Sequence, residues 1–173
     1  MFAAVAQSVE RILGLKICFM QLQERRNIWM VELSTKQKGN ITEMQCAIAL
    51  MQKGYKISFP YGEDCKYDMI VDTGSKLYRV QCKTASPLTN KEDGFKFKTR
   101  SVIITTHGAK ASSYSKDDIE LFATMYEGKC YIVPVQDCGN NEKTLRFHYP
   151  SNGQRKGISL AENYELELSK AFE

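Results

Sequence analysis

Residues 39–86, GNITEMQCAIALMQKGYKISFPYGEDCKYDMIVDTGSKLYRVQCKTAS, contain one helical pattern followed by three short strand patterns. Apolar side chains in the first part recur at spacings of three and four, as along one face of an α-helix. They are Ile41, Met44, Ile48 and Met51. Gly54 follows and favours the left-handed conformation that ends helices. The pattern predicts a helix over residues 37–53 with its apolar face in the core and Glu43 half buried at the margin of that face.

The second part of the stretch predicts strands separated by the turn signals YGEDC and DTGSK. The strands are expected over residues 55–60, 67–72 and 77–84. Because successive side chains in a strand point to opposite faces, Gln81 and Lys83 share one face of the third strand. Val80 and Cys82 point to the other face.

The rest of the chain is richer in strand patterns than in helical ones. Further strands are expected over residues 95–106, 119–125, 130–135 and 145–149. The run LFATM within 119–125 fits a helix as well, and a strand is preferred there. From residue 151 the sequence predicts a loop with a short helix.

Composition allows one domain and sets few limits on its partner. A chain of 173 residues with 43% hydrophobic side chains supports a core of its own. The formal charge of +4 permits a partner rich in phosphate without requiring one. The six cysteines form no CxxC pair, which argues against structural zinc and predicts reduced thiols in a cytoplasmic protein. No stretch approaches the roughly 20 continuous apolar residues of a bilayer span, so no membrane partner is expected.

The first 29 residues differ from the rest of the chain. The segment VAQSVERILG, residues 5–14, looks like the peptide obtained by translating across a transfer RNA gene. Met30 begins MVELSTKQKGN and is a candidate start, which makes residues 1–29 a leader or extension and 30–173 a single domain. The alternative is a genuine amphipathic helix over residues 5–22. A secretory signal is not expected, because Glu10 and Arg11 interrupt the apolar run.

Four polar side chains lie on elements that otherwise favour burial. They are Glu43, Asp68, Gln81 and Lys83. Burying such groups unpaired is costly, so a set of them on core elements favours a site for a metal or a substrate. Hydrolysis of a phosphodiester needs a divalent cation, and Mg²⁺ prefers oxygen ligands. The set therefore predicts a metal-dependent nuclease.

Each of these residue types suits a particular role. Asp68 supplies the main carboxylate to the metal, and Gln81 supplies a carbonyl oxygen in place of a second carboxylate. Lys83 contacts the attacking water or the phosphate. Glu43 binds an outer-shell water of the metal or orients Lys83. Asp72 competes for the metal from the other end of its strand, and Asp68 is preferred because it directly precedes the apolar run MIV.

The same stretch resembles the PD-(D/E)XK nuclease superfamily, and within it the endonucleases associated with group I introns. The similarity extends over residues 38–136 and more loosely through LRFHYPSNGQRKGISLAENYELE. Glu43 matches the helix glutamate, and Asp68 in KYDMIVD matches the metal-binding aspartate. Gln81 and Lys83 in VQCKTAS match a third motif in which Gln replaces the usual acid. Tyr67 stands where the superfamily pattern has Pro, and Gln81 lowers the charge of the metal site by one.

The resemblance implies an α/β, restriction-endonuclease-like core with a central mixed β-sheet flanked by helices. It implies Mg²⁺-dependent cleavage of double-stranded DNA, with Mn²⁺ able to substitute, by a homo-oligomer that is a dimer or a tetramer. The leading interpretation is a site-specific or structure-sensitive DNA endonuclease, of which a homing-type enzyme is one form. A junction-resolving or repair nuclease and a noncatalytic DNA-binding module on the same fold are the alternatives.

Cations for DNA binding are expected in the strand over residues 95–106. Lys96, Lys98 and Arg100 alternate with Phe95 and Phe97, so an extended segment projects the cations from one face while the aromatics anchor the other. The alternative is an ordinary charged edge strand that discourages aggregation.

Overall fold

The computed structural model describes residues 32–173 except 63, 107, 169, 170 and 173. The chain divides into two units, Met1–Ser34 and Thr35–Glu173, and the fold described below is that of the second. The expected helix over residues 5–22 and the candidate start at Met30 lie outside the described residues.

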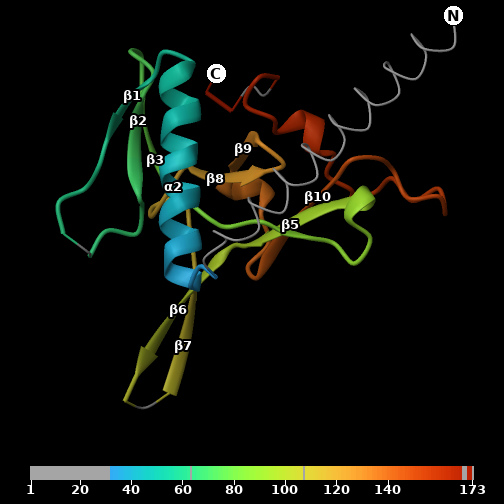
Figure 1. The fold of residues 1–173 in the computed structure, drawn as a ribbon, viewed down its shortest axis with the longest axis horizontal. Coiled ribbons are helices and arrows are strands. Elements are labelled where there is room, and N and C mark those ends of the chain that lie inside the picture. Colours follow the sequence, from blue (N-terminus) through green and yellow to red (C-terminus); the bar gives the residue numbers. More distant parts are fainter. Residues whose placement is uncertain (1–31, 63, 107, 169–170, 173) are drawn as a thin grey trace, which may run out of the picture. The chain divides into compact units, whose positions relative to one another are not determined.

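A five-stranded mixed sheet forms the centre of this unit (Figure 1). Its strands, in spatial order, are β1 (Lys56–Ser58), β2 (Met69–Asp72), β3 (Leu77–Cys82), β8 (Leu121–Tyr126) and β9 (Lys129–Pro134). Neighbouring strands are antiparallel except β3 and β8, which are parallel. The central mixed sheet of the expected fold is confirmed, and the run LFATM is a strand.

One face of the central sheet is covered by α2 (Thr35–Gln52). The helix ends at Gln52, one residue before the predicted end, and Gly54 has φ of +88° and donates its backbone N–H to the Met51 carbonyl at 2.9 Å. Cys46, Ala47 and Leu50 pack against side chains of β2, β3, β8 and β9.

The predicted inner face of α2 is wrong. Ile41, Met44, Ile48 and Met51 are 42%, 50%, 51% and 51% exposed, whereas Cys46 and Leu50 are 0% exposed. The sheet already presents large side chains to the helix, among them Met69 and Tyr78, and the small Cys46 and Ala47 let the helix axis approach them closely. The larger side chains of α2 are therefore left on its outer side.

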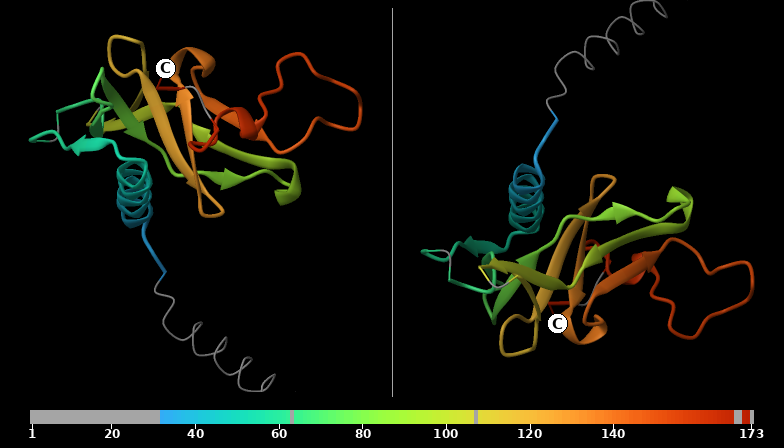
Figure 2. Two further views of the ribbon diagram at one scale, coloured as in Figure 1. Left: turned by 90° about the horizontal axis from the view of Figure 1, so that it is seen from above. Right: turned by 90° about the horizontal axis from the view of Figure 1, so that it is seen from below.

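The opposite face of the central sheet is covered by a second sheet rather than by helices (Figure 2). Its spatial order is β10 (Glu142–Arg146), β5 (Gly94–Lys98) and β4 (Ser86–Pro87). Phe95 and Phe97 of β5 are at most 1% exposed and pack with Phe122 and Val133 of the central sheet. Gly94 has φ of +140°, and a Cβ there would collide with the Leu145 carbonyl oxygen, so the close approach of β5 and β10 requires glycine.

The single strand expected over residues 95–106 is two strands that belong to different sheets. After β5 the chain leaves the sheet at Thr99, which donates its backbone N–H to the Asn141 carbonyl at 3.1 Å and its hydroxyl to the Gly139 carbonyl. It continues as β6 (Arg100–Thr105), which pairs with β7 (Gly108–Ser113) in a hairpin that projects from the sheets (Figure 1). The tertiary contacts of Thr99 cause this break.

The remaining elements are short. The strand expected over residues 145–149 is β10, which begins and ends three residues earlier than predicted. Single 3₁₀ turns form at Lys91–Asp93, Val135–Asp137 and Ala161–Asn163, the last within the tail where a short helix is expected. None of the helices in the described part of the chain is long and apolar enough to cross a membrane.

Candidate active site

Asp68 and Gln81 meet where β2 and β3 pair. The register aligns Met69 with Val80, and the Asp68 backbone N–H donates to the Val80 carbonyl at 2.9 Å, so Asp68 lies beside Gln81. Oδ2 of Asp68 accepts a hydrogen bond from Nε2 of Gln81 and a second, at 2.7 Å, from the Cys82 backbone N–H. The two chain segments thus converge on one carboxylate.

Asp72, the competing carboxylate, has a local structural partner instead. It lies at the opposite end of β2, where its Oδ1 accepts a hydrogen bond from the Gly74 backbone N–H at 2.7 Å. This contact closes the turn between β2 and β3. Of the two aspartates, Asp68 and not Asp72 therefore lies beside Gln81.

Lys83 follows the last residue of β3 and continues its pairing with β8. Its backbone N–H donates to the Ala123 carbonyl at 2.9 Å. Val80 and Cys82 belong to the core beneath α2, so the alternation expected for β3 places Gln81 on the other face. The end of β3 is held from both sides, by Asp68 and by β8, which fixes the position of the Lys83 backbone.

Glu43 reaches the site from α2. Its neighbour Thr42 is 6% exposed and places its hydroxyl 3.2 Å from that of Thr84, the residue after Lys83. Burial raises the pKa of the Glu43 carboxyl, and the nearby charge of Asp68 raises this pKa further. The helical acid therefore lies within the electrostatic range of the strand carboxylate.

The pKa of Asp68 is raised as well. Burial is the main cause, and it is opposed by the hydrogen bonds from Cys82 and Gln81 and by the charge of Lys83. Two partly buried carboxyls with raised pKa values beside one ammonium group form an environment that a divalent cation would stabilise. The structure thus brings together all four predicted site residues.

Tyr114 is a further member of the site that the sequence patterns do not indicate. Nζ of Lys83 donates a hydrogen bond to the Tyr114 hydroxyl at 3.1 Å and lies 4.9 Å from the centre of its ring. The ring in turn packs edge-on against Phe122 of β8, with ring centres 5.4 Å apart. Tyr114 therefore orients the Lys83 ammonium group. It lies 31 residues along the chain from Lys83, so no local spacing reveals the contact.

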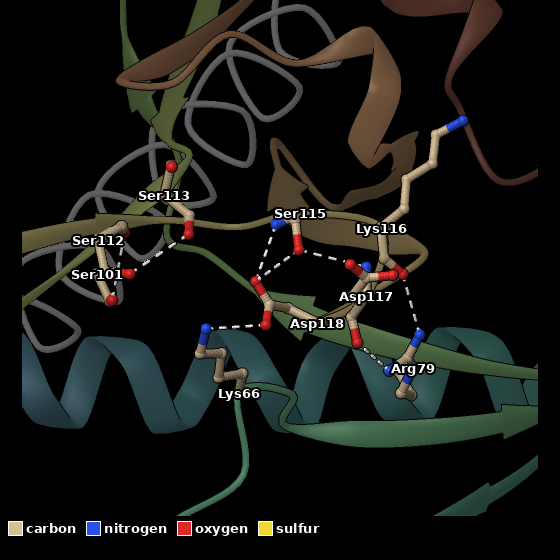
Figure 3. Close-up of polar contacts among 9 residues, drawn as sticks. All are labelled: Lys66, Arg79, Ser101, Ser112, Ser113, Ser115, Lys116, Asp117 and Asp118. Carbon is tan, nitrogen blue, oxygen red and sulfur yellow. Dashed lines mark hydrogen bonds and ion pairs between the residues drawn. The ribbon is translucent and has the colours of Figure 1, made fainter.

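A polar turn, residues 115–118, follows Tyr114 directly in the chain (Figure 3). The backbone N–H and hydroxyl of Ser115 donate to Oδ2 of Asp118 at 2.9 and 3.0 Å, and Lys66 donates to Oδ1 at 2.8 Å. These contacts lower the pKa of Asp118 to about 2. The Arg79 guanidinium donates to the Lys116 and Asp117 carbonyls.

This network joins the three chain segments that carry the site. Lys66 lies two residues before Asp68, and Arg79 lies two residues before Gln81. Arg79 also binds Glu120, the residue before β8, both through its guanidinium and through its backbone N–H at 2.7 Å. The site is therefore preorganised by ion pairs that lie outside it.

The donor set fits a hard divalent cation. The oxygen donors are the carboxylates of Asp68 and Glu43 and the amide oxygen of Gln81, which are ligand types that Mg²⁺ prefers. In the structure the Gln81 amide presents its nitrogen to Asp68, and turning the amide plane over would present the oxygen at the same place. Among the described residues, no three His, Cys, Asp or Glu side chains are grouped to hold a metal ion. A metal site at this place therefore needs the amide oxygen of Gln81 as a ligand.

The three cations expected to bind DNA do not share one strand. Lys96 and Lys98 lie on β5, and both form ion pairs with Glu142 of β10, at 3.3 and 2.9 Å. Arg100 lies on β6 and donates to Oδ1 of Asn141 at 3.3 Å. Phe95 and Phe97, which alternate with the lysines, are buried as expected. Lys98 is the more exposed of the pair at 62%, so partial neutralisation by Glu142 still leaves it accessible.

Comparison with known proteins gives a family and a fold. The family model described as PD-(D/E)XK endonuclease matches residues 33–167. No curated protein matches the chain. Among solved structures, that of a bacterial homing endonuclease, I-Ssp6803I, superposes with a TM-score of 0.62 at 22% sequence identity, covering 77% of this chain and 89% of that one. At this level of identity the match shows a common fold, of the restriction-endonuclease-like α/β class.

Proposed function

The chain belongs to the PD-(D/E)XK endonuclease family, and from this premise we propose that it is a Mg²⁺-dependent enzyme that cleaves double-stranded DNA. The observation that carries the proposal is the contact between Asp68 and Gln81 beside Lys83. It joins an acid, an amide and an ammonium group where β2 and β3 pair. Mn²⁺, which accepts the same ligands, should substitute for Mg²⁺.

Each side chain has a defined task in hydrolysis. When bound, Mg²⁺ would polarise water and neutralise charge that develops on the phosphate. Asp68 and Gln81 would hold the ion through oxygen atoms. Lys83, oriented by Tyr114, would donate to the phosphate oxygen or to the attacking water as negative charge builds up. Glu43, whose pKa is raised by burial, is suited to accept a proton from an outer-shell water.

The proposal extends to a homing-type enzyme that acts as a homo-oligomer. Support comes from the glutamine in place of the third acid, which resembles the intron-associated endonucleases, and from the fold shared with a bacterial homing endonuclease. A single chain contains one Asp68–Gln81–Lys83 set, and cutting both strands at one place is simplest with two. The unpaired cysteines of the described residues are compatible with a reducing, cytoplasmic setting.

A plasmid-nicking assay with Mg²⁺ titration tests the activity. Purified wild-type chain should convert supercoiled plasmid to nicked and linear forms only when Mg²⁺ or Mn²⁺ is added. Asp68→Ala and Lys83→Ala should abolish cleavage and retain DNA binding in a mobility-shift assay. Asp72→Asn, which changes a carboxylate of the same strand while keeping the turn contact, is the matched control and should cut normally.

Two results would reject the proposal. Undiminished cutting by both the Asp68 and Lys83 variants would show that the chemistry lies elsewhere. Failure of wild-type chain to cut linear or branched duplexes with either metal would identify a noncatalytic DNA-binding module. Preference for branched over linear duplexes would instead favour a junction-resolving enzyme on the same site.

A further inference from the structure

The outer side of α2 carries an apolar stripe, defined here as Ile41, Met44, Ile48 and Met51, each 42–51% exposed. The helix packs on β1, β3 and β8 through its other side. At about 100° per residue, the stripe lies diametrically opposite the buried Cys46 and Leu50. The solvent-facing side of a surface helix normally carries charged and polar residues, whereas this side of α2 exposes isoleucine and methionine.

The part of α2 that carries the stripe has a single charged side chain. Between Gly39 and Gln52 the only ionisable group besides the cysteine thiol is Glu43, which lies beside Asp68 on the site side. The exposed polar neighbours of the stripe are Asn40, Gln45 and Gln52. Complementary charge, which steers the encounter of unlike partners and selects among them, is lacking along this part of the helix. A surface that meets its own copy across a two-fold axis benefits from having no charge to repel itself.

The stripe is also complementary to a second copy of itself. Its members follow the three–four–three interval of two coiled-coil heptads, with isoleucine at one core position and methionine at the other. When two such helices run antiparallel, Ile41 meets the second copy's Met51, and Met44 meets the second copy's Ile48. Every contact thus joins a β-branched to a flexible side chain, and no like residues collide.

We propose that a second copy of this chain binds the α2 stripe, forming an antiparallel helix pair around a two-fold axis. The pairing leaves the buried face of each α2 and its Glu43 in place. It supplies a second Asp68–Gln81–Lys83 set, with which both DNA strands can be cut at one place, and this part of the inference rests on the function proposed above.

Sedimentation velocity of the full chain tests the proposal without any nuclease assay. Wild-type chain should be dimeric at tens of micromolar. Ile48→Glu and Met44→Lys each place two charges in the helix pair and should raise the dimer dissociation constant by at least about tenfold. Both positions are half exposed, so circular dichroism should show an unchanged fold. Leu77→Glu, which alters an exposed apolar residue of β3, is the control and should remain dimeric.

Mixing the two variants tests the antiparallel register. In the mixed pair the carboxylate introduced by Ile48→Glu on one chain would meet the ammonium group introduced by Met44→Lys on the other. The remaining Met44 and Ile48 would meet as in wild type. An equal mixture should therefore recover dimer that neither variant forms alone. A monomeric wild-type chain, or variants that dimerise like wild type, would overturn the proposal, and failure of the mixture to recover would overturn the antiparallel arrangement.

The same measurement separates this inference from the nuclease function. Asp68→Ala should dimerise like wild type, because Asp68 lies away from the stripe. If wild-type chain cuts DNA but does not dimerise, only the surface is misassigned. If it dimerises through the stripe but never cuts DNA, only the nuclease function fails.

Discussion

Asp68 is held in a setting that disfavours its charge, and this has a measurable consequence for stability. Because burial raises its pKa above the ordinary 3.8, the folded chain binds the proton more tightly than the unfolded chain does. The contribution of Asp68 to stability is therefore greatest below the unfolded pKa and is lost as the pH rises through the folded pKa.

We expect Asp68→Asn to raise the melting temperature at neutral pH and to abolish cleavage. The gain should shrink towards pH 4, where the wild-type carboxyl is also protonated. Mg²⁺ should stabilise wild-type chain but not this variant, because the carboxylate that attracts the ion is gone. Thermal melts at several pH values, with and without Mg²⁺, measure both effects. Asp72→Asn should retain the Mg²⁺ effect, and loss of that effect in both variants would place the ion elsewhere.

Tyr114 tests whether the orientation of Lys83 matters for rate. Tyr114→Phe keeps the ring that lies beside the ammonium group and against Phe122, and removes only the hydroxyl that accepts its hydrogen bond. Loss of a hydrogen bond to a charged group costs about 1.5 kcal/mol, so the single-turnover cleavage rate should fall roughly tenfold. DNA binding and melting temperature should stay unchanged. A wild-type rate in this variant would make Tyr114 a packing residue only.

At the scale of secondary-structure elements, the ion pairs between β5 and β10 set how much positive charge remains on the surface proposed to bind DNA. Glu142 neutralises Lys96 and Lys98 together, and they hold its pKa below the ordinary value. Glu142→Gln should therefore strengthen DNA binding at low salt, by roughly three- to tenfold. Lys98→Ala should weaken binding and reduce the slope of log affinity against log salt by about 1.

The control for this pair is an ion pair on another strand. Lys129 of β9 binds Glu165 at 2.9 Å and is similarly exposed. Lys129→Ala should leave the affinity and its salt dependence unchanged. If it weakens binding as much as Lys98→Ala does, the contribution of β5 is not specific, and net charge alone accounts for affinity.

Local sequence patterns predict where the helices and strands of this fold lie better than they predict which face of each element is buried. The bounds of α2 and the positions of β1 to β3 follow from periodicity, turn residues and Gly54. The same signals do not predict which side of α2 is buried. The helix has two apolar arcs, one through Ile41 and Ile48 and one through Cys46 and Leu50. The choice depends on the shape of the sheet beneath, which is built from residues distant in sequence.

The candidate site shows the same division. Alternation predicts that Gln81 and Lys83 share a face of their strand, and the antiparallel pairing of β2 with β3 brings Asp68 beside Gln81. Tyr114 reaches the site from the long segment that connects β3 to β8, which includes the β6–β7 hairpin, so no local pattern predicts its contact with Lys83. The split of the strand over residues 95–106 is likewise beyond local patterns, since Thr99 is held by the distant Gly139 and Asn141.

At the scale of the whole unit, the central sheet holds Asp68, Gln81 and Lys83 of the proposed site and lies between two coverings. One covering, the β5–β10 sheet, bears the cations proposed for DNA. The other, α2, contributes Glu43 on one side and the apolar stripe on the other. The same helix therefore carries both Glu43 of one site and the stripe through which we propose that a second copy, with its own site, binds.

This linkage predicts that inactive chains interfere with active ones. When wild-type chain is mixed with a large excess of Asp68→Ala, most active chains should pair with an inactive copy and cut one strand only. Nicked plasmid should then accumulate in place of linear product, as gel analysis of a time course would show.

The double variant Asp68→Ala with Ile48→Glu provides the control for this interference. It should not pair, so the same excess should leave linearisation at the rate of wild-type chain alone. Linear product formed at an unchanged rate despite excess Asp68→Ala would mean that one copy cuts both strands in succession. Pairing through α2 would then serve DNA binding rather than double-strand cleavage, because every active chain would complete the cut without a second catalytic set.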